Sequence, residues 1–186
     1  DKLHEAIKLY LVQASKAELS EAESRRYVEI LTFTMNLEHI GDIIDKNLME
    51  LAAKKVRNGY TFSPEGIADI QRFHGRITDT MRLALNVFAT RDISLARLLF
   101  EDKATTRHAE RAAAADHFAR LKDGRSETVE TSSIHLDIIR DLKRIHGHLT
   151  SVAYPILEAE GELAETRLKA REEERAPPAG AIERPA

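Results

Sequence analysis

A single apolar seam near the C-terminal end most constrains the fold of this chain. Six aliphatic residues follow one another at steps of 4, 3, 4, 3 and 4: Ile138, Leu142, Ile145, Leu149, Val152 and Ile156. Such steps place side chains on one face of an α-helix, and helices with this seam pack lengthwise against their neighbours. No stretch alternates apolar and polar residues for long enough to predict a strand. The chain is therefore predicted to be all-α.

Capping residues mark where the first helices begin and end. Residues 1 to about 17 have apolar residues at helical spacing, and Ser20 with Glu23 forms a capping-box pattern. The capping box predicts a second helix that runs to about Arg57, where Asn58-Gly59 provides a left-handed stop. The apolar seam expected for the second helix consists of Tyr27, Ile30, Phe33, Leu37, Ile40, Ile44 and Leu51.

Three further helices follow, separated by short connections. Ser63-Pro64 predicts the start of a third helix that ends near Thr90, Asp92 caps a fourth that ends near Gly124, and Ser126 or Thr128 opens the fifth. The seam expected for the third helix consists of Ile67, Ile70, His74, Ile77, Met81, Ala84 and Phe88. Long helices joined by short connections predict an antiparallel bundle.

Composition limits the classes of function. The chain has 186 residues, a formal net charge of −3 and no cysteine. These values exclude disulfides and Cys-ligated metals and give no general attraction to nucleic acid. No run approaches the ~18 apolar residues of a membrane span, so we expect no direct membrane insertion of this segment. Because the first residue is Asp1 within a helical pattern, we expect the chain to be a piece of a longer protein.

An internal repeat of low identity is visible in the two longest predicted helices. When "NLEHIGD" (36–42) is placed over "DLKRIHG" (141–147), Leu37 meets Leu142 and Ile40 meets Ile145. We therefore divide a predicted helical domain, 1–162, into a partial first repeat and a second repeat, and expect a largely disordered charged tail rich in Pro and Ala. The boundaries are 1–58, 63–160 and 163–186.

The first copy of this repeat carries a candidate metal site. Glu38 and Asp42 are four residues apart and share a helix face with Asp45. Carboxylate oxygens suit divalent metals and iron, although neighbouring helices would have to supply further ligands. The alternative is an ordinary solvated acidic face. In the second copy, Lys143 and Gly147 stand where the two carboxylates would be.

The histidines do not predict a catalytic site. His74 interrupts an apolar seam and is expected to be a hydrogen-bonded core residue, whereas His108 and His117 are expected at the surface. His146 and His148 point in different directions on a helix and cannot chelate one ion together. His148 aligns with a mixed-charge stripe that predicts ion pairs and consists of Asp137, Asp141 and Arg144. Because no catalytic or phosphate-loop motif occurs, we expect the chain not to be an enzyme.

Two segments resemble a known family. "NLEHIGDIIDKNL" and, about a hundred residues later, "IHLDIIRDLKRIHGHLTSVAYPIL" resemble the PhoU-like domains of bacterial phosphate physiology, over residues 1–160. The second segment is most similar to the cytoplasmic C-terminal domain of bacterial sodium/phosphate cotransporters. The resemblance implies two three-helix bundles side by side, the first here lacking its opening helix. It also implies an acidic metal motif, which Glu38 and Asp42 match and Lys143 and Gly147 do not.

The resemblance implies a function in phosphate transport or homeostasis. The expectation is a non-catalytic regulatory or interaction domain of a sodium-dependent phosphate transporter, at the cytoplasmic face of the inner membrane. Its expected partners are the transporter domain of the same chain and a second copy, with no nucleic acid. A free-standing PhoU-type regulator is the alternative, and a carboxylate-metal helical-bundle enzyme is a third. No cofactor is expected beyond a divalent metal or iron at Glu38 and Asp42.

Overall fold

The computed structural model of the chain describes residues 2–14, 19–124 and 126–163 and confirms the all-α prediction. These residues form helices and contain no strand. The helices in chain order are α1 (Lys2–Ala14), α2 (Glu21–Asp42), the π-helix η1 (Ile43–Leu48), α3 (Met49–Arg57), α4 (Pro64–Thr90), α5 (Ile93–Lys122), α6 (Ser126–Thr150) and α7 (Ala153–Ala159). The predicted tail, from residue 164 onward, lies outside the described residues.

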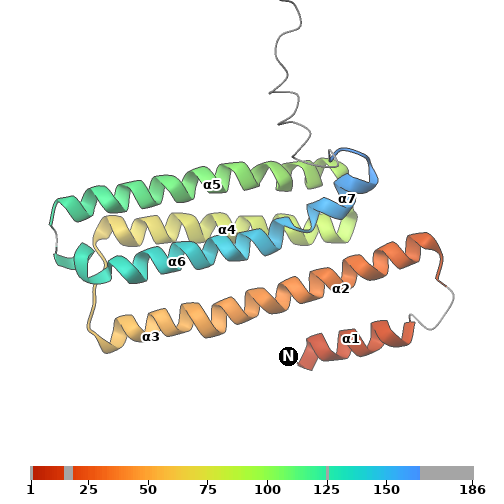
Figure 1. Cartoon of the computed structure of the whole chain (residues 1–186), viewed down its shortest axis with the longest axis horizontal. Helices are drawn as coiled ribbons and strands as arrows, with labels where there is room; N and C mark the ends of the chain where they lie inside the picture. The colour runs from red at the N-terminus through yellow and green to blue at the C-terminus, as the bar shows by residue number, and fades with distance from the viewer. Residues whose placement is uncertain (1, 15–18, 125, 164–186) are drawn as a thin grey trace, which may run out of the picture.

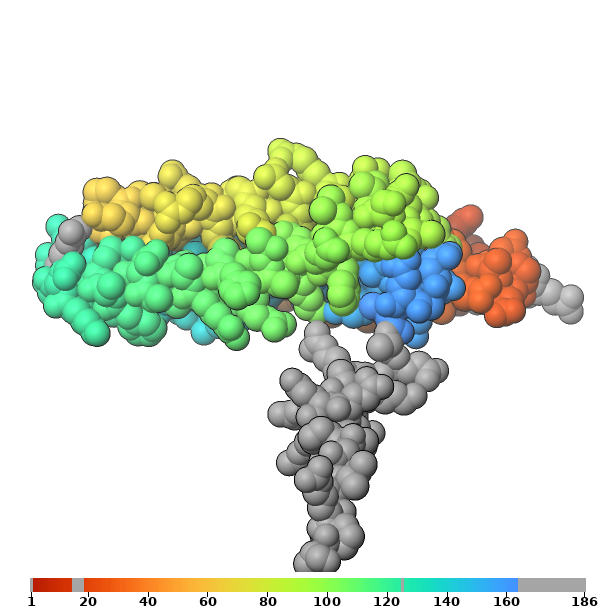
Figure 2. All heavy atoms as spheres, turned by 90° about the horizontal axis from the view of Figure 1, so that it is seen from above, coloured from red at the N-terminus to blue at the C-terminus, as the bar shows by residue number. Residues whose placement is uncertain are grey.

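Helices α4, α5 and α6 pack into an antiparallel three-helix bundle, and α2, η1 and α3 lie beside it as one continuous rod (Figure 1). We call α2–η1–α3 the long rod. It contacts α6 along much of its length, and α1 runs back along its N-terminal half. Figure 2 shows α7 folded against the N-terminal part of α5. None of the described helices is both long and apolar enough to cross a membrane.

The capping predictions are confirmed. Ser20 Oγ accepts a hydrogen bond from the Glu23 backbone N–H, and the Glu23 carboxylate accepts one from the Ser20 N–H, completing the capping box. Ser63 and Asp92 accept the equivalent bonds at the starts of α4 and α5. The chain leaves α3 at Gly59 with φ of +65°, a conformation that glycine adopts without a steric penalty.

The π-helix in the middle of the long rod was not predicted. Ile43 is buried, whereas Ile44, which the sequence assigns to the core, is 46% exposed. The next apolar side chain turned toward the core is Leu48, five residues after Ile43. This spacing matches the i to i+5 hydrogen bonds of a π-helix, whereas an α-helix would bring the residue four positions on to the same face. The π-turn therefore rotates the C-terminal part of the rod by one residue, so that Leu48 and Leu51 still face the bundle.

The seam of α4 also differs from its prediction. Ile67 and His74 are exposed, whereas Phe73 and Val87 are buried, so the prediction of His74 as a core histidine is wrong. The buried face of α4 contains small and polar residues that apolar periodicity does not detect. This face consists of Gly66, Asp69, Phe73, Ile77, Thr80, Ala84 and Val87.

The seam predicted near the C-terminal end packs into the core over most of its length. Leu142, Ile145 and Leu149 are buried on α6. Val152 and Ile156 are buried too, although α6 ends at Thr150 and Ile156 lies on α7. These residues join one apolar core cluster with residues from α2, η1, α4 and α5.

Candidate functional site

The two carboxylates of the predicted metal motif lie in the middle of the long rod, at the start of the π-helix. The carboxylate of Asp42 accepts a hydrogen bond from Lys46 Nζ at 2.8 Å. This bond, with smaller contributions from the charges of Glu38 and Asp45, raises the pKa of Lys46. The acidic face is therefore partly neutralised by a lysine from the same helix, and Lys46 stays a cation throughout the physiological range.

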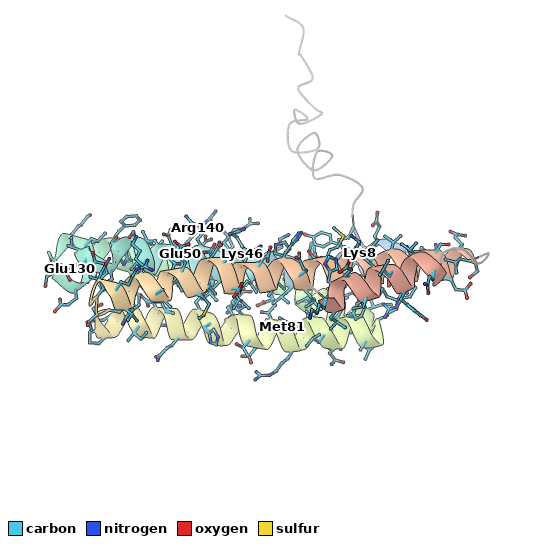
Figure 3. The ribbon with its side chains drawn as sticks, turned by 90° about the horizontal axis from the view of Figure 1, so that it is seen from below. Lys8, Lys46, Glu50, Met81, Glu130 and Arg140 are labelled. Carbon is cyan, nitrogen blue, oxygen red and sulfur yellow. The ribbon has the colours of Figure 1, made fainter. Side chains whose placement is uncertain are left out.

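A groove of about 400 Å³ separates this part of the rod from α6. Figure 3 views the rod from below, with Lys46 labelled on it and α6 alongside. Cations, imidazoles and one carboxylate from both helices line the groove, and we call it the rod–α6 groove. Its lining residues are His39, Asp42, Ile43, Lys46, Asn47, Arg144 and His148.

Polar side chains join the two walls of this groove. His148 Nδ1 lies 2.9 Å from Asn36 Oδ1, and the amide of Asn36 donates a hydrogen bond to Ser151 Oγ at 2.9 Å. This arrangement assigns the proton to Nδ1 of neutral His148 and leaves its Nε2 unprotonated. Burial lowers the pKa of His148, and the nearby His39 and Arg144 lower it further.

Asp141 anchors the α6 wall. Its side chain is nearly fully buried, and its Oδ1 accepts hydrogen bonds from Arg144 Nη1 at 2.9 Å and from Asn47 Nδ2 at 3.4 Å. Within the mixed-charge stripe of α6, the pair of Arg144 and Asp141 is present as predicted, whereas Asp137 pairs at 3.0 Å with Arg140, which lies outside the stripe. Asn47, which no sequence argument singled out, lies in the π-helix and reaches across to α6.

The degenerate copy of the motif has a different environment. Lys143, at the position that matches Glu38, forms an ion pair with Glu110 of α5. Gly147, at the position that matches Asp42, has no neighbouring atom near the place where a Cβ would stand. The second repeat therefore keeps the helix and replaces the carboxylate pair by a surface ion pair.

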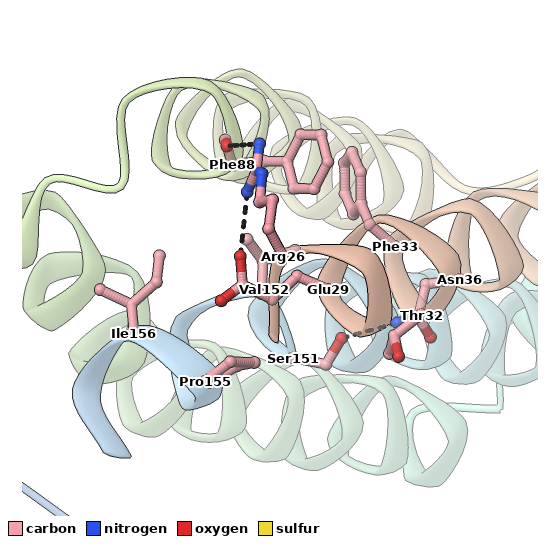
Figure 4. Close-up of a pocket in the computed structure, with 10 residues that line it drawn as sticks. All are labelled: Arg26, Glu29, Thr32, Phe33, Asn36, Phe88, Ser151, Val152, Pro155 and Ile156. Atoms are coloured by element: carbon pink, nitrogen blue, oxygen red, sulfur yellow. Dashed lines mark hydrogen bonds and ion pairs between the residues drawn. The ribbon is translucent and has the colours of Figure 1, made fainter. Parts of the chain in front are cut away.

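A second, much smaller pocket lies near the N-terminal end of the rod and has space for about one water molecule (Figure 4). Arg26 donates from Nη2 to the carbonyl oxygen of Phe88 at 3.1 Å and stacks its guanidinium 4.5 Å from the ring of Phe88. Glu29 bridges Arg26 and Arg91, each at 3.0 Å. These contacts fasten the rod to the end of α4 and leave no room for a larger ligand.

Buried charges inside the α4–α5–α6 bundle were missed by the sequence analysis. Asp69 accepts a hydrogen bond from Arg120 at 2.6 Å and also pairs with Arg72. His117 and His135 stack with centroids 4.6 Å apart, and His117 is 2% exposed, so its prediction as a surface residue is wrong. Asp69 is in phase with Phe73 and Ile77, and this phase indicates burial only once the structure shows that Phe73 faces the core.

A histidine–carboxylate pair joins the same three helices farther along the bundle. His146 Nε2 lies 2.9 Å from Asp102 Oδ2, while Thr80 Oγ1 donates to the same oxygen at 2.9 Å and Arg76 bonds the other at 2.7 Å. Burial is the largest influence on the pKa of His146 and lowers it, although Asp102 opposes the shift. Because Asp102 already accepts from Thr80 and Arg76, this pair serves as an interhelical contact.

The metal prediction at Glu38 and Asp42 stays a prediction. Across the described residues, no three His, Asp or Glu side chains are grouped so that they could hold a metal ion. One carboxylate oxygen of Asp42, Oδ2, which would serve as a ligand, accepts a hydrogen bond from Lys46. Asp45, the third candidate, is exposed on the π-helix.

Comparison with known proteins gives consistent relatives. Residues 70–156 match the PhoU domain family. The chain is 36% identical over 160 residues to the Escherichia coli O157:H7 protein named "Putative inorganic phosphate export protein YjbB", with 86% of this chain covered. It is 37% identical over 156 residues to the Salmonella typhimurium protein of the same name.

The chain spans about 30% of the length of these curated relatives, and no solved structure matches it. The PhoU match extends from within α4 through α5 and α6 into α7. Together with the antiparallel helices described above, these matches identify the fold of this chain as a PhoU-like all-α bundle.

Proposed function

We propose that this chain is a non-catalytic regulatory and interaction module of phosphate homeostasis that acts on a phosphate transporter. One observation carries the proposal: 86% of the chain is 36% identical to a protein named for inorganic phosphate export. The match of residues 70–156 to the PhoU domain family supports the regulatory part.

Two arrangements fit this role. The PhoU match supports a free-standing regulator that docks on its target. The similarity to longer proteins named for phosphate export supports one domain of a larger phosphate transport protein. In this second arrangement we propose a sodium-dependent transporter, with the module at the cytoplasmic face of the inner membrane. The reading frame around residues 1–186 distinguishes them. Repeated long apolar segments in the same frame indicate the transporter domain, and a frame with little more than one additional helix indicates the free regulator.

The structure suggests how such a module would act. The long rod contributes apolar residues to the core and also meets α6 through polar contacts, such as Asn36 with His148 and Asn47 with Asp141. These polar contacts can exchange for water at small cost. A transporter surface that contacts the rod better in one of two positions would shift the balance between them. The bundle of α4, α5 and α6, with its buried core, would serve as the fixed part.

Phosphate flux in the host tests the proposal. We expect deletion of the gene to change the rate of phosphate export or the internal phosphate level, and the intact gene to restore both. A strain with unchanged flux and unchanged internal phosphate, in both phosphate-rich and phosphate-poor medium, would contradict the proposal.

Elemental analysis tests the metal prediction and the enzyme alternative. Protein purified without chelators would contain stoichiometric iron, manganese or another divalent metal if Glu38 and Asp42 hold an ion, and Glu38→Ala would remove it. Absence of metal would exclude both the site and a carboxylate-metal enzyme. Light scattering of the purified protein tests whether a second copy is a partner.

A further inference from the structure

We infer that the rod–α6 groove binds inorganic phosphate, with Lys46 and Arg144 as donors and Asp42 as the acceptor of the proton that phosphate still carries. The inference rests on the proposed function for the identity of the ligand. The site itself rests on the lining of the groove, where cationic, imidazole and carboxylate groups from two helices face one space.

The cations come from opposite walls. Lys46 belongs to the π-helix and Arg144 to α6, and their side chains are 67% and 52% exposed. Each is held by one carboxylate, Lys46 by Asp42 and Arg144 by Asp141. An ammonium has three donors and a guanidinium five, so both can bond a phosphate oxygen while they keep these partners.

The imidazole of His148 adds a response to charge. Its ring lies 5.2 Å from that of His39, and burial, with His39 and Arg144 nearby, lowers its pKa. An anion in the groove would oppose this shift, because it stabilises the protonated form of the His148 ring. Since the fixed charges of Lys46, Arg144, Asp42 and Asp141 cancel, binding of a phosphate dianion should be accompanied by proton uptake at His148.

Asp42 decides which anion is accepted. A carboxylate repels an anion that has no proton, such as sulfate, but it accepts a hydrogen bond from an anion that has a hydroxyl. Inorganic phosphate near neutral pH keeps at least one O–H. Phosphate and sulfate are tetrahedral oxyanions of similar size. In a complex with sulfate the carboxylate of Asp42 would face the anion without a hydrogen bond, so the groove should prefer phosphate.

The π-turn places these groups together. It begins immediately after Asp42 and carries both Lys46 and Asn47, which line the groove. π-Turns inside α-helices are frequent at functional sites, because they change the direction of side chains at a small cost in helix stability. Asn47 contributes an amide that already contacts Asp141 from the rod side.

Direct binding measurements test the inference. Titration of the whole protein with inorganic phosphate, by calorimetry and by NMR of the histidine ring protons, should show saturable binding with shifts at His39 and His148. Sulfate at equal ionic strength should bind at least about tenfold more weakly. Calorimetry in two buffers of different ionisation heat should show proton uptake.

Variants separate the roles of the groups. Asp42→Asn should bring the phosphate and sulfate affinities close together, since an amide can donate to either anion. Lys46→Gln should weaken phosphate binding by about tenfold. The matched control is Arg82→Gln. Arg82 lies on α4 outside the groove and forms an exposed ion pair with Asp79, so this variant should leave phosphate binding unchanged.

Three results would overturn the inference: no saturable phosphate binding, equal affinity for sulfate in the unmodified protein, or unchanged binding in Lys46→Gln. The outcome is distinguishable from failure of the proposed function. If phosphate does not bind but gene deletion still alters phosphate flux, this site is wrong and the regulatory role stands. If phosphate binds but flux is unaffected, the regulatory role is wrong and the site stands.

Discussion

Asp69 is 4% exposed inside the α4–α5–α6 bundle, and its charge is balanced by Arg120, whose side chain is 12% exposed. Taking two charges out of water is costly, and the cost is recovered only while both partners remain. The periodicity of apolar residues could not reveal this pair, because a pattern that counts aspartate as a surface residue reads position 69 as outward-facing. Its phase with Phe73 became meaningful only once the helices were placed.

Removal of the Asp69 carboxylate should therefore be strongly destabilising. We expect Asp69→Ala to lower the free energy of unfolding by about 3–5 kcal/mol, because it leaves the guanidinium of Arg120 buried without its partner. Urea denaturation measures the change. The control is Asp79→Ala, which removes an exposed partner of Arg82 and should cost less than about 1 kcal/mol. Equal losses in the two variants would contradict the structural role of Asp69.

His135 should make stability fall in mild acid. Burial lowers its pKa to about 4, and the neighbouring His117 contributes to the shift. An unfolded histidine has a pKa of about 6.5, so between these values the unfolded chain takes up a proton that the folded chain does not. The stabilising contribution is thus complete above pH 6.5 and is lost as the pH falls toward 4, at up to about 1.4 kcal/mol per pH unit.

Unfolding by urea at pH 7 and pH 5 measures this dependence. His135→Phe keeps a buried ring but cannot titrate, so its stability should depend less on pH than that of the unmodified protein. His108→Phe changes an exposed histidine and serves as the control. If His135→Phe and the unmodified protein lose the same stability between the two pH values, the effect does not come from His135.

At the scale of helices, the boundaries were predicted better from the sequence than the buried face of each helix. Ser20, Ser63 and Asp92 mark helix starts, because capping hydrogen bonds are local and need no tertiary contact. The π-turn is different, because Ile43 and Ile44 are chemically identical neighbours. Which of the two isoleucines enters the core depends on where Leu48 meets the bundle. That position is set by tertiary packing and cannot be derived from the local sequence.

The phase shift of the long rod can be tested by single deletions. Deleting exposed Ile44 should convert the π-turn to an α-turn and keep Leu48 and Leu51 facing the bundle. We expect a loss of only about 1 kcal/mol. Deleting Met35, which is similarly exposed at 44%, should rotate Phe33 out of the core and cost about 3 kcal/mol or more. Thermal denaturation followed by circular dichroism compares the two, and equal losses would contradict the phase argument.

The candidate site was predicted in part. The spacing of Glu38 and Asp42 located the region of interest, and the rod–α6 groove does contain Asp42. What the spacing could not show is the opposite wall. Arg144 and His148 are separated from Asp42 by about a hundred residues, and their approach follows from how the rod lies along α6.

At the scale of the whole molecule, burial is uneven. α6 places many residues in the core, whereas the long rod buries three, Phe33, Ile40 and Ile43, and none of them lies on α3. Segments with few buried apolar contacts open at a lower free energy than the rest of the domain. The long rod is therefore expected to detach from the bundle of α4, α5 and α6 before that bundle unfolds.

Hydrogen exchange measures this difference. Amides within residues 21–57 should exchange at least about tenfold faster than those in the centre of α6. Asn36→Ala, which removes bonds to His148 and Ser151, should speed exchange in the rod and leave α4 and α5 unchanged. Uniform protection over both parts, or an equal acceleration in both, would show that they open as one unit.

The unbroken course of the long rod has a mechanical consequence. From Glu21 to Arg57 it runs without a loop, which makes it a stiff shaft about 55 Å long. Arg26 and Glu29 fasten its N-terminal end to α4, whereas α3 at the other end buries no residue. A tilt of about 5° about the fastened end would move the C-terminal tip by roughly 5 Å. The free end of the rod would thus convert a small change of angle into a displacement larger than a hydrogen-bond length.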